Sequence, residues 1–352
     1  MRDRLLWPPQ GRLSGRHSVP PVIVGVLGVG RIGATHAANL ARLPDVEVAV
    51  YDPDAAAVER AVARTGAQAL PDREAVLGEA DALIIATPTA NHPDDLAAGA
   101  AAAVPMLCEK PISLDVESTA AALQVVEGSG VELQVGFMRR FDTGFVEMRR
   151  LVESGELGDV YLVRAASHDH VPPHESYLDQ SGSVYRDMHI HDFDAIRWLT
   201  GRDVVEVFAA GSVLVDEMFR RHGDVDMTAL VLMLEGGVLA SITGARANPL
   251  GYDHRTEVIG SRDAVCAGWT ERTPLRSADP TGATGPVNPY PAFPERFGPA
   301  YRAEVESFVA LCRGDGENRS PGHTALEALR VAVAADRSLA EHRPVAVSEI
   351  NP

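Results

Sequence analysis

The stretch "GVLGVGRIGATHAANL", residues 25–40, decides the fold class of the N-terminal half. It sets Gly28, Gly30 and Gly33 in a GxGxxG array between a short apolar run and an amphipathic segment. The first glycine permits a tight turn, the second lets a pyrophosphate approach the backbone, and the third lets strand and helix pack closely. The pattern predicts a strand, a phosphate-binding turn and a helix whose N-terminus faces anions.

An acidic residue stands at the end of the next predicted strand. "VEVAVYD", residues 46–52, ends in Asp52, 19 residues after Gly33. A carboxylate there can accept both hydroxyls of an adenosine ribose and would repel a 2'-phosphate. Pro53 follows in place of an arginine, so the sequence favours NAD over NADP. The alternative is that the glycines serve packing only and that Asp52 caps a helix.

Short apolar runs alternate with helical patterns from residue 22 to about residue 137. The runs are "VIVGVL", "VEVAVYD", "DALIIAT", "VPMLCE" and "VELQVGF". Strands that are apolar along their length and joined by amphipathic helices indicate a parallel sheet covered on both faces. We therefore expect residues 21–138 to form an NAD-binding Rossmann domain.

The second half of the chain has a different pattern. Longer alternating runs lie close together, and "EGG" at residues 235–237 is typical of a hairpin turn. We expect residues 139–346 to form an α/β domain with a large, mostly antiparallel open sheet. A loop rich in proline and glycine spans residues 273–294. Alanine-rich helices are predicted near residues 301–312 and 325–339, where they can pack back on the first domain.

Composition excludes several classes of protein. A length of 352 residues suggests two domains of ordinary size. A net charge of −17 argues against nucleic-acid and anionic membrane partners. Apolar stretches fall well short of the ~20 residues of a membrane-spanning helix. Cys108, Cys266 and Cys312 fit neither a disulfide framework nor a zinc motif, which favours the cytoplasm. Residues 1–20 lack a signal-peptide pattern and are expected to be a mobile tail.

Lys110 is the only lysine in the chain, since every other basic side chain except histidine is an arginine. It directly follows the predicted parallel strand "VPMLCE", at the sheet edge where open α/β sheets bind ligands. A solvated surface lysine is the plain alternative, but such a position would be expected to carry arginine here. Lysine offers a compact donor with an adjustable pKa, whereas arginine keeps its proton. We infer a chemical role for Lys110.

A second informative stretch is "SGSVYRDMHIHDFDAIRWLTG", residues 181–201. Asp187 and His191 are four residues apart, on a loop that enters an apolar-periodic helix, and they share a face if helical geometry has begun by Asp187. A histidine can accept an alcohol proton, and a nearby carboxylate can orient it. On spacing alone, a helix cap at Asp187 beside an ordinary polar histidine is the better interpretation.

A resemblance decides between these interpretations. The glycine turn, "CEKP" at residues 108–111, "GFMRRFD" at 136–142, "RDMHIHDFD" at 186–194 and "ERFGPAYRAEVESFV" at 295–309 together resemble the Gfo/Idh/MocA oxidoreductase family, in particular its inositol 2-dehydrogenase branch. The similarity runs from about residue 22 to residue 346. It implies a Rossmann domain, a second domain with a large open sheet, and a Lys-Pro peptide that is often cis.

The resemblance also implies a set of site residues. Its catalytic trio matches Lys110, Asp187 and His191. Its cofactor residues match Gly28, Gly30, Arg31, Ile32, Gly33, Asp52, Thr87, Pro88, Thr89, Asn91, His92, Glu109, Lys110 and Met138. Its substrate residues match Lys110, Arg139, Asp169, Asp187, His189, His191 and Tyr252.

The implied reaction is the oxidation of a ring hydroxyl with NAD. His191 accepts the hydroxyl proton, Lys110 stabilises the developing alkoxide, and Asp187 orients the pair. The chain departs from the branch at His189, where threonine is common, at the "HDH" of residues 168–170, and at Leu250. These positions are expected to line the pocket, so the departures leave the substrate in doubt.

Histidines gather at positions 168, 170, 174, 189 and 191. Imidazole is a good ligand for zinc or nickel, which invites a metal site. No cysteine or carboxylate stands at metal-ligand spacing, so we expect pocket or surface histidines and no functional metal.

Several functions compete. The leading one is NAD-dependent oxidation of a cyclic polyol, myo-inositol or a close relative. The same chemistry on another sugar, an anhydrosugar or an aminocyclitol is the alternative, followed by redox-recycling glycosidase chemistry. A catalytically silent NAD-sensing regulator belongs to another class, and the presence of the whole trio argues against it. The free sheet face and the resemblance imply a homodimer or homotetramer.

Overall fold

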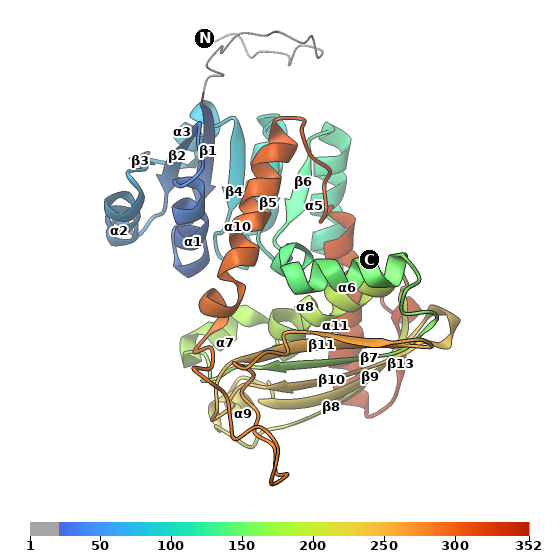
Figure 1. The fold of residues 1–352 in the computed structure, drawn as a ribbon. Coiled ribbons are helices and arrows are strands. Elements are labelled where there is room, and N and C mark those ends of the chain that lie inside the picture. Colours follow the sequence, from blue (N-terminus) through green and yellow to red (C-terminus); the bar gives the residue numbers. More distant parts are fainter. Residues whose placement is uncertain (1–20, 352) are drawn as a thin grey trace.

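The computed structural model describes residues 21–351, which form two domains, each built around one β-sheet (Figure 1). The predicted N-terminal tail, residues 1–20, lies outside the described residues. No helix among the described residues is long and apolar enough to cross a membrane.

The first domain holds a six-stranded sheet in the order β3-β2-β1-β4-β5-β6. The strands are β1 (Val22–Leu27), β2 (Val46–Tyr51), β3 (Gln68–Ala69), β4 (Ala82–Ile85), β5 (Met106–Cys108) and β6 (Leu133–Val135). Every pairing is parallel. All four residues of β4 are buried, as expected for a central strand with both faces covered. The predicted doubly wound sheet is confirmed, with the strand order of a dinucleotide-binding fold.

Helices connect these strands, and several begin and end at the residues that local chemistry favours. They are α1 (Arg31–Leu40), α2 (Ala55–Thr65), α3 (Arg73–Glu79), η1 (Thr89–Asn91), α4 (His92–Ala101) and α5 (Val116–Ser129). The Asp54, Asp72 and Asp115 carboxylates cap α2, α3 and α5 by accepting backbone N–H bonds. Gly66 and Gly130 end α2 and α5 in the left-handed conformation.

The second domain holds a seven-stranded sheet in the order β12-β11-β7-β10-β9-β8-β13. The strands are β7 (Val160–His168), β8 (Val204–Ser212), β9 (Met227–Leu234), β10 (Leu239–Ala245), β11 (Asp253–Gly260), β12 (Ala264–Ala267) and β13 (Val345–Ala346). Only the β7–β10 pair is parallel among these strands, so the mostly antiparallel sheet is confirmed. The "EGG" turn, η4 (Glu235–Gly237), joins β9 to β10 as predicted.

The helical segments of the second half are η2 (Met138–Phe141), α6 (Thr143–Glu153), α7 (Glu175–Ser181), the π-helix η3 (Tyr185–His189), α8 (Ile190–Thr200), α9 (Met218–Arg221), α10 (Phe293–Cys312), α11 (His323–Glu341) and η5 (Val347–Glu349). Helix α11 packs on β8 and on α8, and it covers one face of the sheet (Figure 1). The other face carries exposed apolar side chains, namely Val205, Phe208, Val231, Met233 and Leu239.

Helix α10 returns to the first domain. Val305, Phe308 and Val309 pack in one core cluster with residues of β1 and β2, so α10 lies against the six-stranded sheet beside α1 (Figure 1). It begins at Phe293, well before the predicted start near residue 301, because it continues across Pro299. Proline lacks the N–H of a helical hydrogen bond, which is why the sequence pattern favoured a later start.

Candidate active site

The carboxyl ends of the parallel strands bring the predicted cofactor residues to one edge of the first sheet. Gly28 follows β1, Asp52 follows β2, Thr87 follows β4 and Lys110 follows β5. Parallel strands all end at the same edge, and in open α/β sheets ligands bind there. The clustering therefore follows from strand order, although these residues are scattered over more than 80 positions of sequence.

The glycine turn has the close approaches that its motif requires. Gly28 has φ +81°, and a Cβ on it would lie 2.6 Å from the Ala86 carbonyl oxygen. A Cβ on Gly33 would lie 1.8 Å from the Gly28 carbonyl oxygen, so helix and turn are in direct contact. A Cβ on Gly30 would meet nothing within 4 Å, which leaves the approach to the start of α1 open. The turn fits a pyrophosphate at the helix N-terminus.

Asp52 fixes the glycine turn to the second strand. Its Oδ2 accepts the Val29 N–H at 2.8 Å, and its Oδ1 accepts the Asp54 N–H at 2.9 Å. Each carboxylate oxygen keeps a free lone pair, and the side chain is half-buried. The arrangement fits a carboxylate that also accepts ribose hydroxyls, and that contact stays a prediction.

Six other predicted cofactor residues are partly or fully exposed along this edge, namely Arg31, Ile32, Thr87, Pro88, Thr89 and Asn91. His92, another predicted cofactor residue, is 1% exposed, and its contact with a cofactor stays a prediction. Its Nδ1 lies 2.8 Å from the Pro111 carbonyl oxygen and its Nε2 lies 2.8 Å from the Thr87 carbonyl oxygen. Because both ring nitrogens lie at hydrogen-bond distance from carbonyl oxygens, His92 connects the Lys110 loop to the Thr87 loop.

Glu109 and Met138 also lie behind the cofactor edge. Glu109 is 8% exposed, and its Oε1 lies 2.7 Å from His36 Nε2. Met138 is buried in the main hydrophobic core. Both predictions rested on position in a motif, and the contact of these buried side chains with a cofactor stays a prediction.

Lys110 and Asp187, 77 positions apart, meet in the structure. Lys110 Nζ donates to the Asp187 carbonyl oxygen at 2.7 Å and to its Oδ1 at 3.2 Å. The Lys110–Pro111 peptide is cis, as the family resemblance implied. The structure thus joins the end of β5 to the π-helix η3 at the junction of the two domains.

Asp187 receives two further donors that sequence reasoning missed. Arg246 Nη2 donates to its Oδ2 at 2.9 Å, and the Tyr177 hydroxyl donates to its Oδ1 at 2.9 Å. Burial alone would raise the pKa of the Asp187 carboxyl, but the Lys110 and Arg246 charges and the Tyr177 hydrogen bond outweigh it and hold that pKa well below its ordinary value. Asp187 is therefore a carboxylate at any working pH.

Neither missed residue carried a usable sequence signal. Arg246 follows β10 in a chain whose arginines are too common for one of them to stand out. Tyr177 lies on α7, outside every motif. Both reach Asp187 only because the fold brings α7 and the end of β10 beside η3.

His191 lies one residue after the start of α8, and its environment differs from the prediction. Among the described residues no hydrogen bond joins it to Asp187, and its buried Nδ1 has no partner. The ring packs edge-on against Phe137, with centroids 6.1 Å apart. Burial and then the Lys110 and Arg139 charges hold the pKa of His191 well below its ordinary value of 6.5. This favours a neutral imidazole at His191, and Asp187 hydrogen-bonds to Lys110 and not to this ring.

The π-helix explains this difference. Asp187 lies in η3, whereas regular α-helical geometry begins only at Ile190. A π-turn changes the number of residues per turn, so a four-residue spacing no longer stacks two side chains on one face. The expectation that Asp187 and His191 form a pair assumed an α-helix through both.

A buried polar layer supports the site from below. His189 is fully buried, with Nδ1 2.8 Å from Asp192 Oδ2 and Nε2 2.7 Å from Thr228 Oγ1. Arg139 is 2% exposed and forms an ion pair with the same Asp192 carboxylate. The polar atoms of Arg139 and His189 are enclosed in this layer, and their predicted contact with a substrate stays a prediction. They hold α8, the helix that carries His191, against β7 and β9.

Asp169 and Tyr252 are nearer to the trio. Arg246 Nη1 lies 3.2 Å from Asp169 Oδ2, so one guanidinium bridges Asp169 and Asp187. Burial raises the pKa of Asp169 despite the Arg246 charge. Tyr252 is 6% exposed and stacks on His254 with ring centroids 4.2 Å apart. Their contact with a substrate stays a prediction.

The remaining histidines of the cluster do not converge. His168 Nε2 lies 3.1 Å from Thr243 Oγ1, His170 Nδ1 lies 2.8 Å from the Asn248 carbonyl oxygen, and His174 Nδ1 lies 2.9 Å from Ser176 Oγ. Within residues 21–351, potential metal ligands come close together in one group of three, away from these histidines. The group consists of His36, Glu109 and Glu304.

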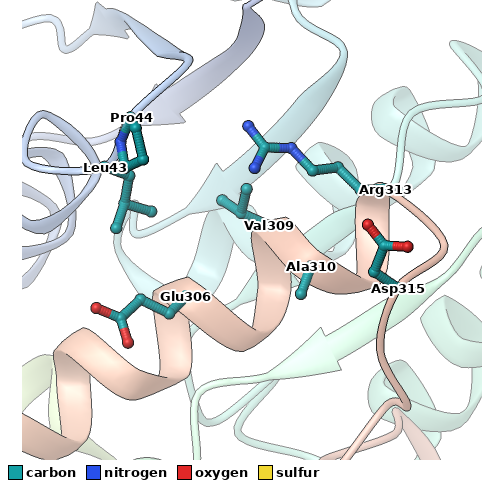
Figure 2. A pocket seen from close by; sticks show the side chains of 7 residues that line it. All are labelled: Leu43, Pro44, Glu306, Val309, Ala310, Arg313 and Asp315. Atoms are coloured by element: carbon teal, nitrogen blue, oxygen red, sulfur yellow. The ribbon is translucent and has the colours of Figure 1, made fainter. Parts of the chain in front are cut away.

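A surface pocket of about 200 Å³ lies elsewhere, on the first domain. Figure 2 shows Glu306 and Val309 of α10, and Arg313 directly after the end of this helix, facing Leu43 and Pro44 across this pocket. It contains none of the predicted catalytic or cofactor residues.

Comparisons with known proteins agree with this geometry. Residues 22–137 match an oxidoreductase family with an NAD-binding Rossmann fold, and residues 145–265 match the GFO/IDH/MocA C-terminal domain. An inositol 2-dehydrogenase of Rhizobium meliloti is 38% identical over 326 residues, which cover 92% of this chain and 98% of that protein. A myo-inositol dehydrogenase of Streptomyces leeuwenhoekii is 38% identical over 319 residues, 90% of this chain and 96% of that protein.

Among solved structures, the scyllo-inositol dehydrogenase of Lactobacillus casei with bound NAD(H) and scyllo-inositol has a TM-score of 0.85 and 27% identity. The match covers 93% of this chain and 99% of that one. The two family models match the two halves of the chain in order, and the first matched region contains the sheet edge with the glycine turn. The chain is a member of the GFO/IDH/MocA oxidoreductase family, with an NAD-binding Rossmann domain as its first half.

Proposed function

We propose that this protein oxidises a ring hydroxyl of a cyclic polyol to a ketone with NAD, and that its substrate is an inositol. The observation that carries the proposal is the Lys110–Asp187 contact beside a neutral His191, at the sheet edge that follows the glycine turn. A base, a cationic donor and a cofactor edge at one place are what alcohol oxidation requires.

His191 is the proposed base. An imidazole that stays neutral at working pH can accept the hydroxyl proton, and general-base catalysis of this kind contributes typically about 100- to 10,000-fold in rate. NAD, when bound, supplies the acceptor for the hydride that leaves the carbon bearing this hydroxyl. When His191 takes the proton, the electron pair of the O–H bond stays on the oxygen and forms the C=O bond as the hydride leaves the carbon.

Lys110 is the proposed donor to the substrate oxygen. Its ammonium stabilises the negative charge that develops as the proton leaves. The two contacts to Asp187 restrict the lysine side chain, and Arg246 and Tyr177 restrict Asp187 in turn. The donor is therefore oriented before a substrate arrives, which lowers the cost of reaching the reactive geometry.

The substrate class is supported by two relatives that match over nearly the whole length of this chain, an inositol 2-dehydrogenase and a myo-inositol dehydrogenase. The Asp169 carboxylate also suits a polyhydroxylated ring, because it is partly exposed beside the Asp187 centre and can accept hydroxyl donors. Another sugar with the same hydroxyl pattern is the alternative.

Turnover of a substrate panel tests the proposal. We expect NADH to accumulate with myo-inositol or scyllo-inositol, and NADP to be a poor replacement because Asp52 would repel its extra phosphate. Accumulation only with an aldose or an aminocyclitol would move the enzyme to the alternative. Tight NAD binding, measured by quenching of tryptophan fluorescence, with no turnover of any polyol or sugar would support a silent NAD sensor.

We also propose that the protein assembles into a homodimer or homotetramer through the outward face of the second sheet. Phe208 and Val231 are neighbours in register on β8 and β9, and both are exposed, at 40% and 50%. Contiguous apolar patches of this kind mark interaction surfaces. A Val231→Glu and Phe208→Glu double variant should sediment as a monomer, and an unchanged mass would contradict this interface.

A cytoplasmic location is proposed on chemical grounds. The three cysteines, Cys108, Cys266 and Cys312, are free thiols in the structure. Burial raises the pKa of Cys312 to about 12, so this thiol is unreactive. A chain with free thiols suits a reducing compartment where NAD is available, and cell fractionation checks it.

A further inference from the structure

Three ionisable side chains meet inside the first domain, outside the proposed catalytic trio. They are His36 on α1, Glu109 after β5 and Glu304 on α10, and one potential ligand atom of each lies within 4.8 Å of the others. Their exposures are 0%, 8% and 0%. The group connects the helix of the glycine turn, the strand end that carries Lys110, and the returning helix α10.

Glu109 is held tightly within this group. Its Oε1 lies 2.7 Å from His36 Nε2, and its Oε2 accepts the backbone N–H of Lys110 at 3.3 Å. A Cβ on Gly136 would lie 2.8 Å from Oε2, so the carboxylate packs against bare backbone at the end of β6. The position of Glu109 is therefore linked directly to the Lys110 peptide.

Glu304 has no such partners. Both of its carboxylate oxygens are buried without a hydrogen bond, and within residues 21–351 no arginine or lysine pairs with it. The titratable or polar groups around it are His36 from α1, Glu109 from β5, Tyr301 from its own helix and Gln134 from β6. A buried carboxylate beside a second carboxylate and without a cation cannot remain ionised at an acceptable cost.

We propose that Glu304 is held as the neutral carboxylic acid and that, beside the hydrogen-bonded His36–Glu109 pair, it acts as a positioning residue for the segment that carries Lys110. The catalytic consequence rests on the proposed function, whereas the protonation state does not. Burial and then the Glu109 charge raise the pKa of Glu304 well above its ordinary value of 4.5, in agreement with the geometry. An ionised Glu304 would repel Glu109 and loosen its contacts with His36 and Lys110.

A divalent metal is the competing occupant, since His and Glu are common ligands. Zinc bonds of 2.0 to 2.2 Å in tetrahedral geometry set ligand atoms about 3.3 Å apart. His36 Nε2 and Glu109 Oε1 are 2.7 Å apart, which is a hydrogen-bond distance. A proton joins this pair, and the same chemistry fits a protonated Glu304.

The protonation state is tested by infrared difference spectroscopy of the full-length protein. The wild type minus Glu304→Gln spectrum at neutral pH should contain the carbonyl band of a protonated carboxylic acid, shifted by deuterium exchange. Glu306→Gln is the matched control, because Glu306 is exposed on the same helix, at the surface pocket (Figure 2). Its difference spectrum should show a carboxylate only.

Two results would overturn the assignment. One is a Glu304→Gln spectrum that shows loss of a carboxylate and no acid band. The other is a metal bound in equimolar amount to the purified wild type and absent from Glu304→Gln. Neither measurement depends on turnover, so the assignment can fail while the proposed function stands, and the reverse.

The positioning role is tested by stability and rate against pH. Because the pKa of Glu304 is raised in the folded state, its contribution to stability is full below pH 4.5 and is lost as the pH rises through the folded-state pKa. As the pH rises from 4.5 to the folded-state pKa, the melting temperature of wild type should fall relative to that of Glu304→Gln. The melting temperature of Glu306→Gln should change with pH as that of wild type does. Equal pH profiles for all three proteins would contradict the proposal.

Turnover supplies the last readout. Glu304→Leu keeps the volume but removes the acid, and it should lower kcat by about tenfold with little change in the KM for NAD, since a small displacement of a reacting group costs up to about 100-fold. Glu304→Gln, which imitates the neutral acid, should restore most of the rate. Full activity in Glu304→Leu would show that Glu304 does not position Lys110.

Discussion

The glycine turn at residues 28–33 and the centre around Asp187 are built in different ways. The turn comes from one contiguous stretch, and the contacts of Gly28 and Gly33 are made within the first domain. The centre is assembled from Lys110, Tyr177, Asp187 and Arg246, which come from four separate segments. A contiguous site follows from local geometry, whereas an assembled one depends on how two domains and a π-turn are packed.

The largest effect is expected where the assembled centre is broken and the turn is left intact. Lys110→Arg should lower kcat by about 100- to 10,000-fold, because a guanidinium cannot take the place of the compact donor to the substrate oxygen. The NAD dissociation constant should change little, because the glycine turn is untouched. Steady-state kinetics and a fluorescence titration with NAD measure the two quantities on the same protein.

The control for Lys110→Arg is His174→Asn, an exposed change near the site that should leave both quantities unchanged. Turnover in Lys110→Arg close to wild type would remove Lys110 from the mechanism and with it the distinction between the two regions.

The next effect concerns the guanidinium that sequence reasoning missed. Arg246→Leu takes away one of the three donors to Asp187 and leaves its carboxylate with Lys110 and Tyr177. We expect kcat to fall by about 100-fold as Lys110 loses its fixed orientation. Arg255→Leu is the control, since Arg255 pairs with Asp253 and does not contact Asp187. Equal rates for the two variants would show that Arg246 is only structural.

The turn is broken by adding one methyl group. In Gly33→Ala the new Cβ would lie 1.8 Å from the Gly28 carbonyl oxygen, so the turn must move. Overpacking of this kind costs about 1 to 3 kcal/mol in the free energy of unfolding. Gly78→Ala, a helical glycine with free space around it, should be neutral or stabilising by up to about 1 kcal/mol. Chemical denaturation compares them, and NAD should restore less stability to Gly33→Ala than to wild type.

The smallest expected effect concerns the shape of the curve of kcat/KM against pH. Because the pKa of His191 is held well below 6.5, its neutral form persists as the pH falls through 6.5. As the pH is lowered, kcat/KM should therefore begin to fall only well below pH 6.5. Between that fall and pH 6.5 it should stay constant. The free energy of unfolding gives a second test, because the contribution of His191 to stability is lost as the pH falls from 6.5 toward its folded-state pKa. An acid limb centred at pH 6.5 would mean that His191 is solvated like a free histidine.

Much of the first domain could be predicted because its information is local. Apolar runs of strand length, the three glycines and Asp52 each follow from residues close together in sequence, and the strand order then places them at one edge. Predictions from motif position alone were weaker. His92 and Glu109 stand in the right motifs, but their side chains turn inward to Pro111 and His36.

The linear sequence by itself determined the Rossmann fold and the cofactor edge, and it was enough to predict a chemical role for Lys110, because turn geometry and a single exceptional residue need no distant partner. Only the tertiary structure decided which groups surround Asp187, that His191 stands without its help, and that Glu304 is buried beside Glu109. The physical reason is burial. The charge and direction of a side chain inside a protein depend on neighbours that the chain brings together only when it is folded.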